Sequence, residues 1–308
     1  MCHPFSTSCD YVVAGQRFRL EGPHADFGPR SGFSVFKRAA ENVSENLSAA
    51  APIFCLATGV DVVKSMDQSQ LKELYVFDYF GAKSRFCTYQ DGYCFWIQEP
   101  QHTPLVMVVP ADKNKCTTNC GLVEPFDLPR FVYLLWLLYG IAALPHKTLA
   151  FHASVAVHSG KAVLFIAESG TGKSTQTRLW REHIPGTGFL NDDSPMVHVT
   201  PEGPWAYGSP WSGKVPVYLD TQYPLAALVR LSQAPYNALS PRLGKLEALA
   251  ATLPACAPEL LYSESLTDGM CAVLTQVVDT VPVYKLACLP NAEAALLVFN
   301  RLKDEGVL

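Results

Sequence analysis

The sequence predicts an α/β protein in which a core domain is built around a glycine-rich loop and a smaller, β-rich α+β domain precedes it. Two observations predict this class. The loop, Ala167-Glu168-Ser169-Gly170-Thr171-Gly172-Lys173-Ser174-Thr175, lies between an apolar, strand-like run and a segment without Gly or Pro. From residue 126 the chain alternates strand and helix patterns, whereas the first third is mostly strand-like. With 308 residues, 49% of them hydrophobic, the chain can hold two domains, which we place at 1–125 and 126–308.

The first domain carries two clear strand signals. Residues 17–21 alternate between polar and apolar side chains, and Asp91-Gly92 between two strand-like runs is typical of a two-residue hairpin turn. In chain order we expect a strand at 17–21, a helix at 34–49, hairpin strands at 85–90 and 93–98, and a strand at 105–109. A polar, cysteine-containing connector at 111–125 then marks the domain boundary.

The second domain begins with the longest apolar stretch of the chain, residues 131–144. About fourteen residues are fewer than the roughly twenty that span a bilayer, so we expect a core helix and no membrane partner. Asp127 suits the cap of this helix, Pro129 its first turn and Pro145 its end. The further expected elements are hairpin strands at 153–157 and 161–167, a helix at 174–182, a strand at 225–231, helices at 245–253 and 266–278, a strand at 283–287 and a terminal helix at 291–303.

Composition narrows the partners and the compartment. The formal net charge of −4 gives no electrostatic reason to bind nucleic acid or an anionic membrane surface. The ten cysteines lack the spacing of a zinc site, and the closest pair, Cys116 and Cys120, is interpreted as two thiols in a polar loop. The N-terminus has neither a cationic start nor an apolar run that would indicate a secretory signal. We therefore expect a cytoplasmic protein with reduced thiols.

The glycine-rich loop matches the pattern G-x-x-x-x-G-K-[ST], with Ala167 at the first glycine position. Gly170 and Gly172 permit the backbone conformations that turn successive N–H groups inward, so residues 169–175 can form an anion nest at a helix N-terminus. Lys173 would reach the β- and γ-phosphates of a nucleotide, and the Ser174 hydroxyl would bind Mg²⁺. The alternative is a glycine-rich turn before a helix. The context of strand, loop and helix favours a nucleotide-binding loop with Ser169, Gly170, Thr171, Gly172, Lys173, Ser174 and Thr175 as its binding residues.

A paired carboxylate follows the loop. Asn191-Asp192-Asp193 comes after one helix and a glycine-containing turn, with Asp192 nineteen residues beyond Lys173. One carboxylate can hold Mg²⁺ while the other accepts the proton of an attacking hydroxyl. Asp192 and Asp193 are therefore both catalytic candidates, and Asp193 is a candidate metal ligand together with Ser174. The alternative is an Asp pair that caps a turn.

Two further features lie near the loop. If Val157 pairs with Lys161, His152 falls opposite Ile166, one residue from the loop, where it could orient or protonate a group near the γ-phosphate; the alternative is a structural histidine. Residues 207–214 form a Gly/Ser/Pro loop that carries one aromatic and one cation. Trp211 could stack on a base or wall off an acceptor, and Lys214 could neutralise transition-state charge, unless the segment is a bare turn.

Three of these elements, in this order, resemble the HPr serine kinase/phosphorylase group and its relatives, which share a nucleotide-binding core with phosphoenolpyruvate carboxykinases. They are His152 before the loop, the segment 168–174, and Asn191-Asp192-Asp193. The similarity extends over about residues 148–215, and the chain has no counterpart to the second HPr kinase signature with its metal-binding glutamate. The loop at 207–214 resembles one in HPr-kinase-related proteins of unassigned substrate, so HPr itself is not the expected acceptor.

The resemblance implies a phosphate-loop kinase core of the HPr kinase/carboxykinase type and self-association. It also implies phosphate binding by Lys173, metal binding by Ser174, and a general base at Asp192 or Asp193 supported by His152. Together the residues predict a kinase that uses ATP and Mg²⁺ to phosphorylate a hydroxyl on a peptide, protein or small molecule.

The sequence leaves alternatives to this function. One is a non-catalytic nucleotide sensor or scaffold, which has no need of a base. A carboxykinase is less favoured because the chain is too short for a full carboxylate-binding half. A GTPase or transporter ATPase is disfavoured by the lack of an Asn-Lys-x-Asp or Leu-Ser-Gly-Gly-Gln motif. Nothing in the first domain identifies the acceptor.

Overall fold

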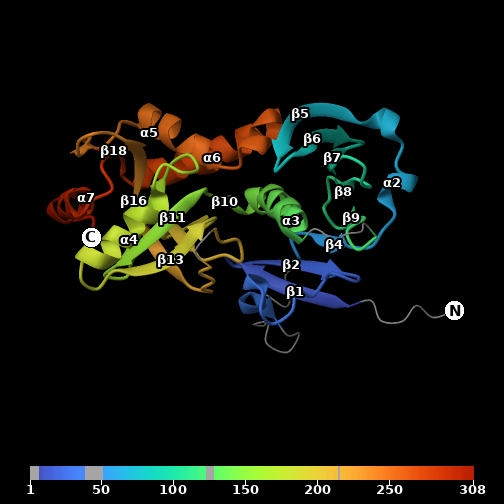
Figure 1. The fold of residues 1–308 in the computed structure, drawn as a ribbon, viewed down its shortest axis with the longest axis horizontal. Helices are drawn as coiled ribbons and strands as arrows, with labels where there is room; N and C mark the ends of the chain where they lie inside the picture. The colour runs from blue at the N-terminus through green and yellow to red at the C-terminus, as the bar shows by residue number, and fades with distance from the viewer. Residues whose placement is uncertain (1–6, 39–50, 123–127, 214–215) are drawn as a thin grey trace. The chain divides into compact units, whose positions relative to one another are not determined.

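The computed structural model describes residues 7–38, 51–122, 128–213 and 216–308, and the chain divides into two compact units (Figure 1). The first comprises Met1–Ala143 together with a later segment, Glu259–Glu264, and the second comprises Leu144–Pro258 and Ser265–Leu308. Each unit holds a large mixed sheet with helices, which agrees with the predicted α/β class. The division differs from the predicted boundary at 125 and 126, because the apolar helix of residues 131–144 lies almost wholly in the first unit.

The sheet of the first unit has nine strands among the described residues, in the order β3-β1-β2-β4-β9-β8-β7-β6-β5. Its pairings are antiparallel except for β2 with β4 and β4 with β9. The predicted strands at 17–21, 85–90, 93–98 and 105–109 are confirmed. In chain order the strands are β1 (Ser8–Val13), β2 (Gln16–Glu21), β3 (Lys37–Arg38), β4 (Cys55–Ala57), β5 (Lys72–Tyr79), β6 (Ala82–Tyr89), β7 (Gly92–Gln98), β8 (Leu105–Val109) and β9 (Cys116–Thr118).

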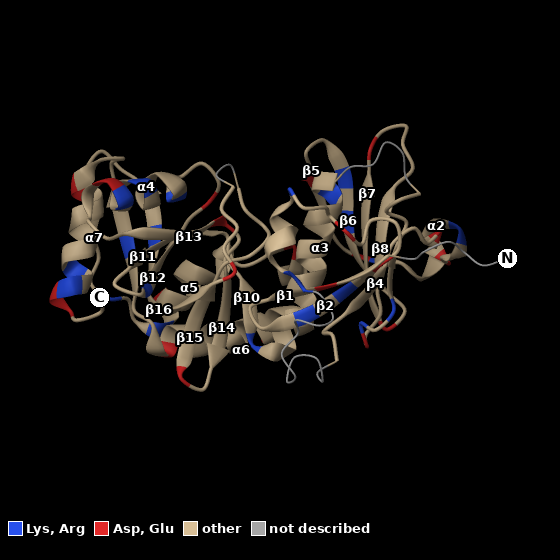
Figure 2. Ribbon diagram, turned by 90° about the horizontal axis from the view of Figure 1, so that it is seen from below, with Lys and Arg blue, Asp and Glu red and all other residues tan. Residues whose placement is uncertain are grey.

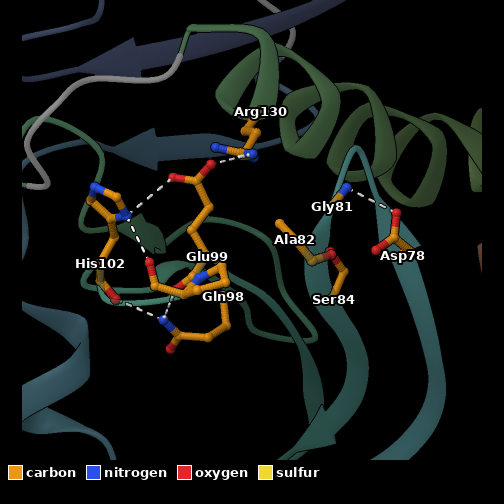
Figure 3. Close-up of polar contacts among 9 residues, drawn as sticks. Asp78, Gly81, Ala82, Ser84, Gln98, Glu99, His102 and Arg130 are labelled. Atoms are coloured by element: carbon orange, nitrogen blue, oxygen red, sulfur yellow. Dashed lines mark hydrogen bonds and ion pairs between the residues drawn. The ribbon is translucent and has the colours of Figure 1, made fainter.

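Helix α3 (Leu128–Ala143) supplies much of the core of the first unit, as its apolar sequence predicts. Its Tyr139 donates a hydrogen bond of 2.8 Å to the carbonyl oxygen of Val13, which ties the helix to β1. Near the start of the helix, Arg130 pairs with Glu99, the residue after β7 (Figure 3). The predicted cap at Asp127 lies outside the described residues. The shorter helical segments of this unit are η1 (Gly32–Val35), α2 (Val62–Ser65), η3 (Gln68–Gln70) and most of η6 (Pro258–Tyr262).

Helix α3 is also the one described segment that, extended to His146, is long and apolar enough to cross a membrane. More than half of the most apolar window of that segment is buried inside the protein. Lys and Arg are interspersed with Asp and Glu on the elements of both units (Figure 2).

Three predictions for the first unit need correction. The described part of the predicted helix 34–49 contains the short helix η1 and strand β3 instead, and 39–49 lies outside the described residues. The hairpin turn is one residue earlier than predicted, because Tyr89 pairs with Gly92 and Gln90 adopts a φ of 53°. Gly92 is a strand residue, where a Cβ atom would lie 2.1 Å from the carbonyl oxygen of Val109. The predicted connector at 111–125 contains β9, in which Cys116 is buried beside β8.

The sheet of the second unit also has nine strands among the described residues, in the order β10-β14-β15-β16-β12-β11-β13, with β18 beside β16 and β17 beside β18. Strands β12, β16 and β18 are parallel to one another, and the other pairs are antiparallel. The predicted hairpin at 153–167 and the strands at 225–231 and 283–287 are confirmed. The strands are β10 (Thr148–Ala150), β11 (Ala153–His158), β12 (Lys161–Ile166), β13 (Gly188–Asp193), β14 (Met196–Thr200), β15 (Gly203–Tyr207), β16 (Gln222–Gln233), β17 (Ala238–Leu239) and β18 (Val283–Cys288).

Helices cover both faces of the parallel part of this sheet. On one face, α4 (Lys173–His183) and α7 (Ala292–Asp304) pack on alternate residues of β12, β16 and β18, including Phe165, Val229 and Leu286. The intervening residues face α5 (Lys245–Thr252), where Arg230 donates to the Ala251 carbonyl oxygen at 3.3 Å. The remaining helical segments are η4 (Leu144–His146), η5 (Leu253–Ala255) and α6 (Glu264–Thr280), so all the helices predicted for this part of the chain are confirmed.

Candidate functional site

The glycine-rich loop lies between β12 and α4, as predicted. Gly170 and Gly172 have φ values of 79° and 119°, which L-residues rarely adopt, and Gly172 is the N-cap of the helix. The loop is closed by a hydrogen bond of 3.3 Å from the Thr171 N–H to the Glu168 carbonyl oxygen. Ser169 and Ser174 are exposed, while Thr171 and Thr175 are half-buried. The first N–H groups of a helix have no partner within the helix and point toward the loop before it. A loop of this shape can therefore bind an anion.

Lys173 folds back under the loop. The residue is only 8% exposed, and its Nζ donates to the carbonyl oxygens of Ala167 at 3.0 Å and Glu168 at 3.3 Å. A third contact of 3.0 Å joins Nζ to Nε2 of His152. Burial lowers the pKa of Lys173, and the charges of Asp193 and Asp192 partly oppose this shift. The loop therefore holds a desolvated cation beside two carboxylates.

His152 lies closer to the loop than the predicted register placed it. The β11–β12 hairpin pairs His158 with Lys161, so Ala153 faces Ile166 and His152 precedes this pair, level with the start of the loop. The turn contains only Ser159 and Gly160, both with positive φ. The His152 N–H donates to the Ala255 carbonyl oxygen at 2.6 Å, which anchors the backbone at this point.

The Nε2 atom of His152 has two competing neighbours. It accepts from Lys173 Nζ at 3.0 Å, and it lies 3.3 Å from Oδ1 of Asp193. A neutral ring that accepts at Nε2 carries its proton on Nδ1, so it cannot donate to Asp193 at the same time. The pairing of His152 therefore depends on where the Lys173 ammonium is directed.

The two aspartates end β13 in different environments. Asp192 is 3% exposed, and its carbonyl oxygen accepts from the Gly213 N–H. The Asp193 side chain is 45% exposed, and the residue has a φ of 145°, which is strained for a side chain with a Cβ atom. Such strained backbone is concentrated at active sites, where the surrounding structure maintains it. Of the pair, Asp193 is therefore the more accessible carboxylate.

Asn191 organises the loop that follows β15, a role the sequence did not reveal. It is fully buried, and its Nδ2 donates to the Trp211 carbonyl oxygen at 3.1 Å and to the backbone and side-chain oxygens of Ser209 at 3.4 and 3.3 Å. Its Oδ1 accepts from the Ser194 N–H at 2.9 Å. The network brings Gly213 so close that an added Cβ would lie 2.8 Å from the Asp192 carbonyl oxygen.

The structure tests only part of what was predicted for the loop at 207–214. Trp211 is 6% exposed, so its ring is not on the surface where it could stack on a base. Lys214 lies outside the described residues, so the structure does not locate its cation. The part of this loop next to the aspartates is residues 209–213, through the Asn191 network and an isolated bridge between Asp193 and Ser212.

Two further pairs of residues were missed by sequence reasoning. The hydroxyls of Ser154 and Thr177 lie 2.7 Å apart and are buried beneath the first turn of α4, with Thr177 also donating to the Lys173 carbonyl oxygen at 3.3 Å. Arg230 and Lys285 are register partners on β16 and β18 and line a depression beside residues 168–171. In the sequence, the signal that could have revealed Arg230 and Lys285 is the single charged residue that each places within an apolar strand pattern.

The described residues contain no group of three or more His, Cys, Asp or Glu side chains that could hold a metal ion alone. A Mg²⁺ ion that accompanies a nucleotide does not need one, because it is bound through one or two protein oxygens, phosphate oxygens and water. The exposed Ser174 hydroxyl and the carboxylates of Asp192 and Asp193 supply oxygen donors of the kind Mg²⁺ prefers, so these residues fit the predicted ion.

Comparisons with known proteins add no identification. A scan against models of protein families finds no match to this chain, and a search of curated proteins finds no relative. The inference of function therefore depends on the chemistry of the site.

Proposed function

We propose that this chain is an ATP-dependent phosphotransferase that moves the γ-phosphoryl group to a hydroxyl on a peptide, protein or small molecule. The observation that carries the proposal is the convergence of Lys173, His152 and Asp193 within 3.3 Å contacts at the mouth of the glycine-rich loop. A cation, a titratable ring and an accessible carboxylate beside an anion nest are the groups that phosphoryl transfer requires. From the sequence motifs we also infer a relationship to the HPr kinase group, and we propose the cytoplasmic location that the composition predicts.

Lys173 provides the charge for the phosphates. Its ammonium is buried, desolvated and held by neutral carbonyl oxygens, so an anionic phosphate is a stronger partner than those it has. When Lys173 turns to the phosphates, Nε2 of His152 loses its donor. Nε2 is then free to accept a proton from the side of Asp193, whose Oδ1 is 3.3 Å away.

Asp193 is the better-placed general base, because its side chain is 45% exposed whereas Asp192 is buried. The acceptor hydroxyl gives its proton to the Asp193 carboxylate, and its oxygen forms a bond to the γ-phosphorus. The bond from that phosphorus to the bridging oxygen of the β-phosphate breaks, and ADP leaves with the electron pair. His152 can receive the proton from Asp193 and so restore the base.

Ser174 and one carboxylate of the aspartate pair would hold the Mg²⁺ that neutralises charge between the β- and γ-phosphates. Asp192 also contributes its charge to the Lys173 site, where it favours the protonated lysine. The buried Asn191 network fixes the backbone on both sides of this carboxylate.

The test is calorimetric titration of Mg²⁺-ATP into the native protein and the Lys173→Ala and Asp193→Asn variants, with ADP formation measured in water and with serine peptides and polyols as acceptors. We expect Lys173→Ala to lose binding. Asp193→Asn should bind within about twofold of the native protein and lose turnover about a hundredfold or more. Asp304→Asn, an exposed aspartate at the end of α7, is the matched control. ATP binding with no ADP formation in the native protein would favour the nucleotide-sensor alternative.

A further inference from the structure

The functional elements of the second unit lie in a row along one edge of its sheet. Following the pairing order, the edge presents Asp193 at the end of β13, His152 before β11, the glycine-rich loop after β12, and then the ends of β16 and β18. Four inter-strand steps separate the first from the last, about 19 Å at about 4.8 Å per step. The groups assigned to the phosphoryl transfer, His152 and Asp193, lie on the β13 side of the loop, so the part of a ligand that does not react has the β16 and β18 side available.

A depression of about 560 Å³ occupies that other side. The loop and the first turn of α4, including Thr175 and Gln176, line one side of it, and Leu231 near the end of β16 with Leu289 and Pro290 after β18 line the other. None of the residues that line it carries a charge. Its volume falls within the range of small-molecule sites, which are mostly apolar with a few placed polar groups. The uncharged side of this lining that the strands provide suits a neutral ring system.

Gln176 gives an independent indication of a ligand. The residue is 2% exposed, it lines the depression, and its Nε2 atom has no hydrogen-bond partner among the described residues. Buried donors are almost always paired in native proteins, because an unpaired one keeps its full desolvation penalty. An acceptor atom on a molecule in the depression would remove this penalty.

The direction of a bound triphosphate connects the two sides. With the γ-phosphate toward Lys173 and His152, the α-phosphate lies toward Thr175, and the remainder of the nucleotide leaves the loop next to Gln176. We propose that the depression between the first turn of α4 and the ends of β16 and β18 is the nucleoside site, in which Gln176 donates to an acceptor atom on the edge of the base. This proposal rests on the proposed function, because it assumes that the loop binds a nucleotide.

The experiment compares Mg²⁺-ATP with Mg²⁺-tripolyphosphate, which has the same phosphate chain and no nucleoside. Both are titrated calorimetrically into the native protein and into Ala234→Phe, which places a ring in the depression from a half-buried position. Ala238→Phe, at an exposed position on β17 outside the depression, is the matched control. Gln176→Leu removes the amide while keeping a similar volume.

We expect Ala234→Phe to weaken ATP binding by about tenfold or more and Gln176→Leu by about five- to tenfold, the loss of one hydrogen bond. Tripolyphosphate binding should stay within about twofold in both variants, and Ala238→Phe should change neither ligand. If the native protein binds the two ligands equally, or if Ala234→Phe weakens both alike, the nucleoside site is wrong and the phosphate site stands. If the native protein binds neither ligand, the proposed function fails and this site fails with it.

Discussion

Replacement of Asn191 by alanine tests whether its buried amide maintains the loop beside the aspartates. Among its hydrogen bonds, those to the Trp211 carbonyl oxygen at 3.1 Å and from the Ser194 N–H at 2.9 Å have the best distances. Each contributes about 1 kcal/mol, and leaving the buried Ser194 N–H without its acceptor costs about 1 kcal/mol more. The expected local destabilisation is therefore about 3 kcal/mol.

Amide hydrogen exchange at Gly213 measures this quantity directly, because its N–H donates to the Asp192 carbonyl oxygen. A loss of about 3 kcal/mol corresponds to about a hundredfold faster exchange through local opening. The control is Asn237→Ala, which removes an asparagine whose side chain makes three hydrogen bonds directly before β17, away from the aspartates in the sequence. Unchanged protection of Gly213 in a folded Asn191→Ala protein would refute the role of the network.

Three further predictions concern the loop and its support. Burial lowers the pKa of Lys173 below its ordinary value of 10.5, and the protonated form binds phosphate, so ATP affinity should fall as pH rises through the lowered pKa; affinity that is constant from neutral pH to 10.5 would contradict this. Gly213→Ala forces a Cβ atom to 2.8 Å from the Asp192 carbonyl oxygen, and turnover should fall about tenfold or more with ATP affinity nearly unchanged in calorimetry. Thr177→Val leaves the buried Ser154 hydroxyl without its 2.7 Å partner and should lower the free energy of unfolding in urea by about 1–2 kcal/mol, whereas a value equal to that of the native protein would exclude a supporting role.

Local patterns predicted most of the elements, and they failed where neighbouring strands decide the outcome. Asp91-Gly92 identified the hairpin, but the turn begins at Gln90, because Gly92 is needed where β8 approaches its backbone too closely for a side chain. Cys116 appeared to belong to a polar connector, yet it pairs into the sheet next to β4 and is buried. Contacts between segments distant in sequence are not visible in a local pattern.

In the candidate site, too, local features were predicted and contacts between distant segments were not. The backbone at the glycines and at Asp193 has the positive φ values of tight local turns. Because such turns depend on neighbouring residues, the motifs were sufficient to indicate where the loop, Lys173 and the aspartates lie. His152 came out one residue nearer the loop, because the hairpin uses the shortest turn. The roles of Asn191 and Gln176 could not be predicted. The acceptors of the Asn191 amide lie eighteen to twenty residues away, and Gln176 is distinguished by a side-chain nitrogen without a hydrogen-bond partner among the described residues.

Because it includes the segment Glu259–Glu264, the first unit is completed later during synthesis than its N-terminal position suggests. This segment belongs to the first unit, where Tyr262 stacks on Tyr75 at 3.7 Å and Ser263 lies within hydrogen-bonding distance of the Tyr93 hydroxyl, yet nearly all of the second unit's sheet is made before it. An N-terminal domain ordinarily folds first as the chain emerges from the ribosome. Here the first unit can assemble its sheet early, but it acquires its last piece only after more than a hundred further residues have been translated.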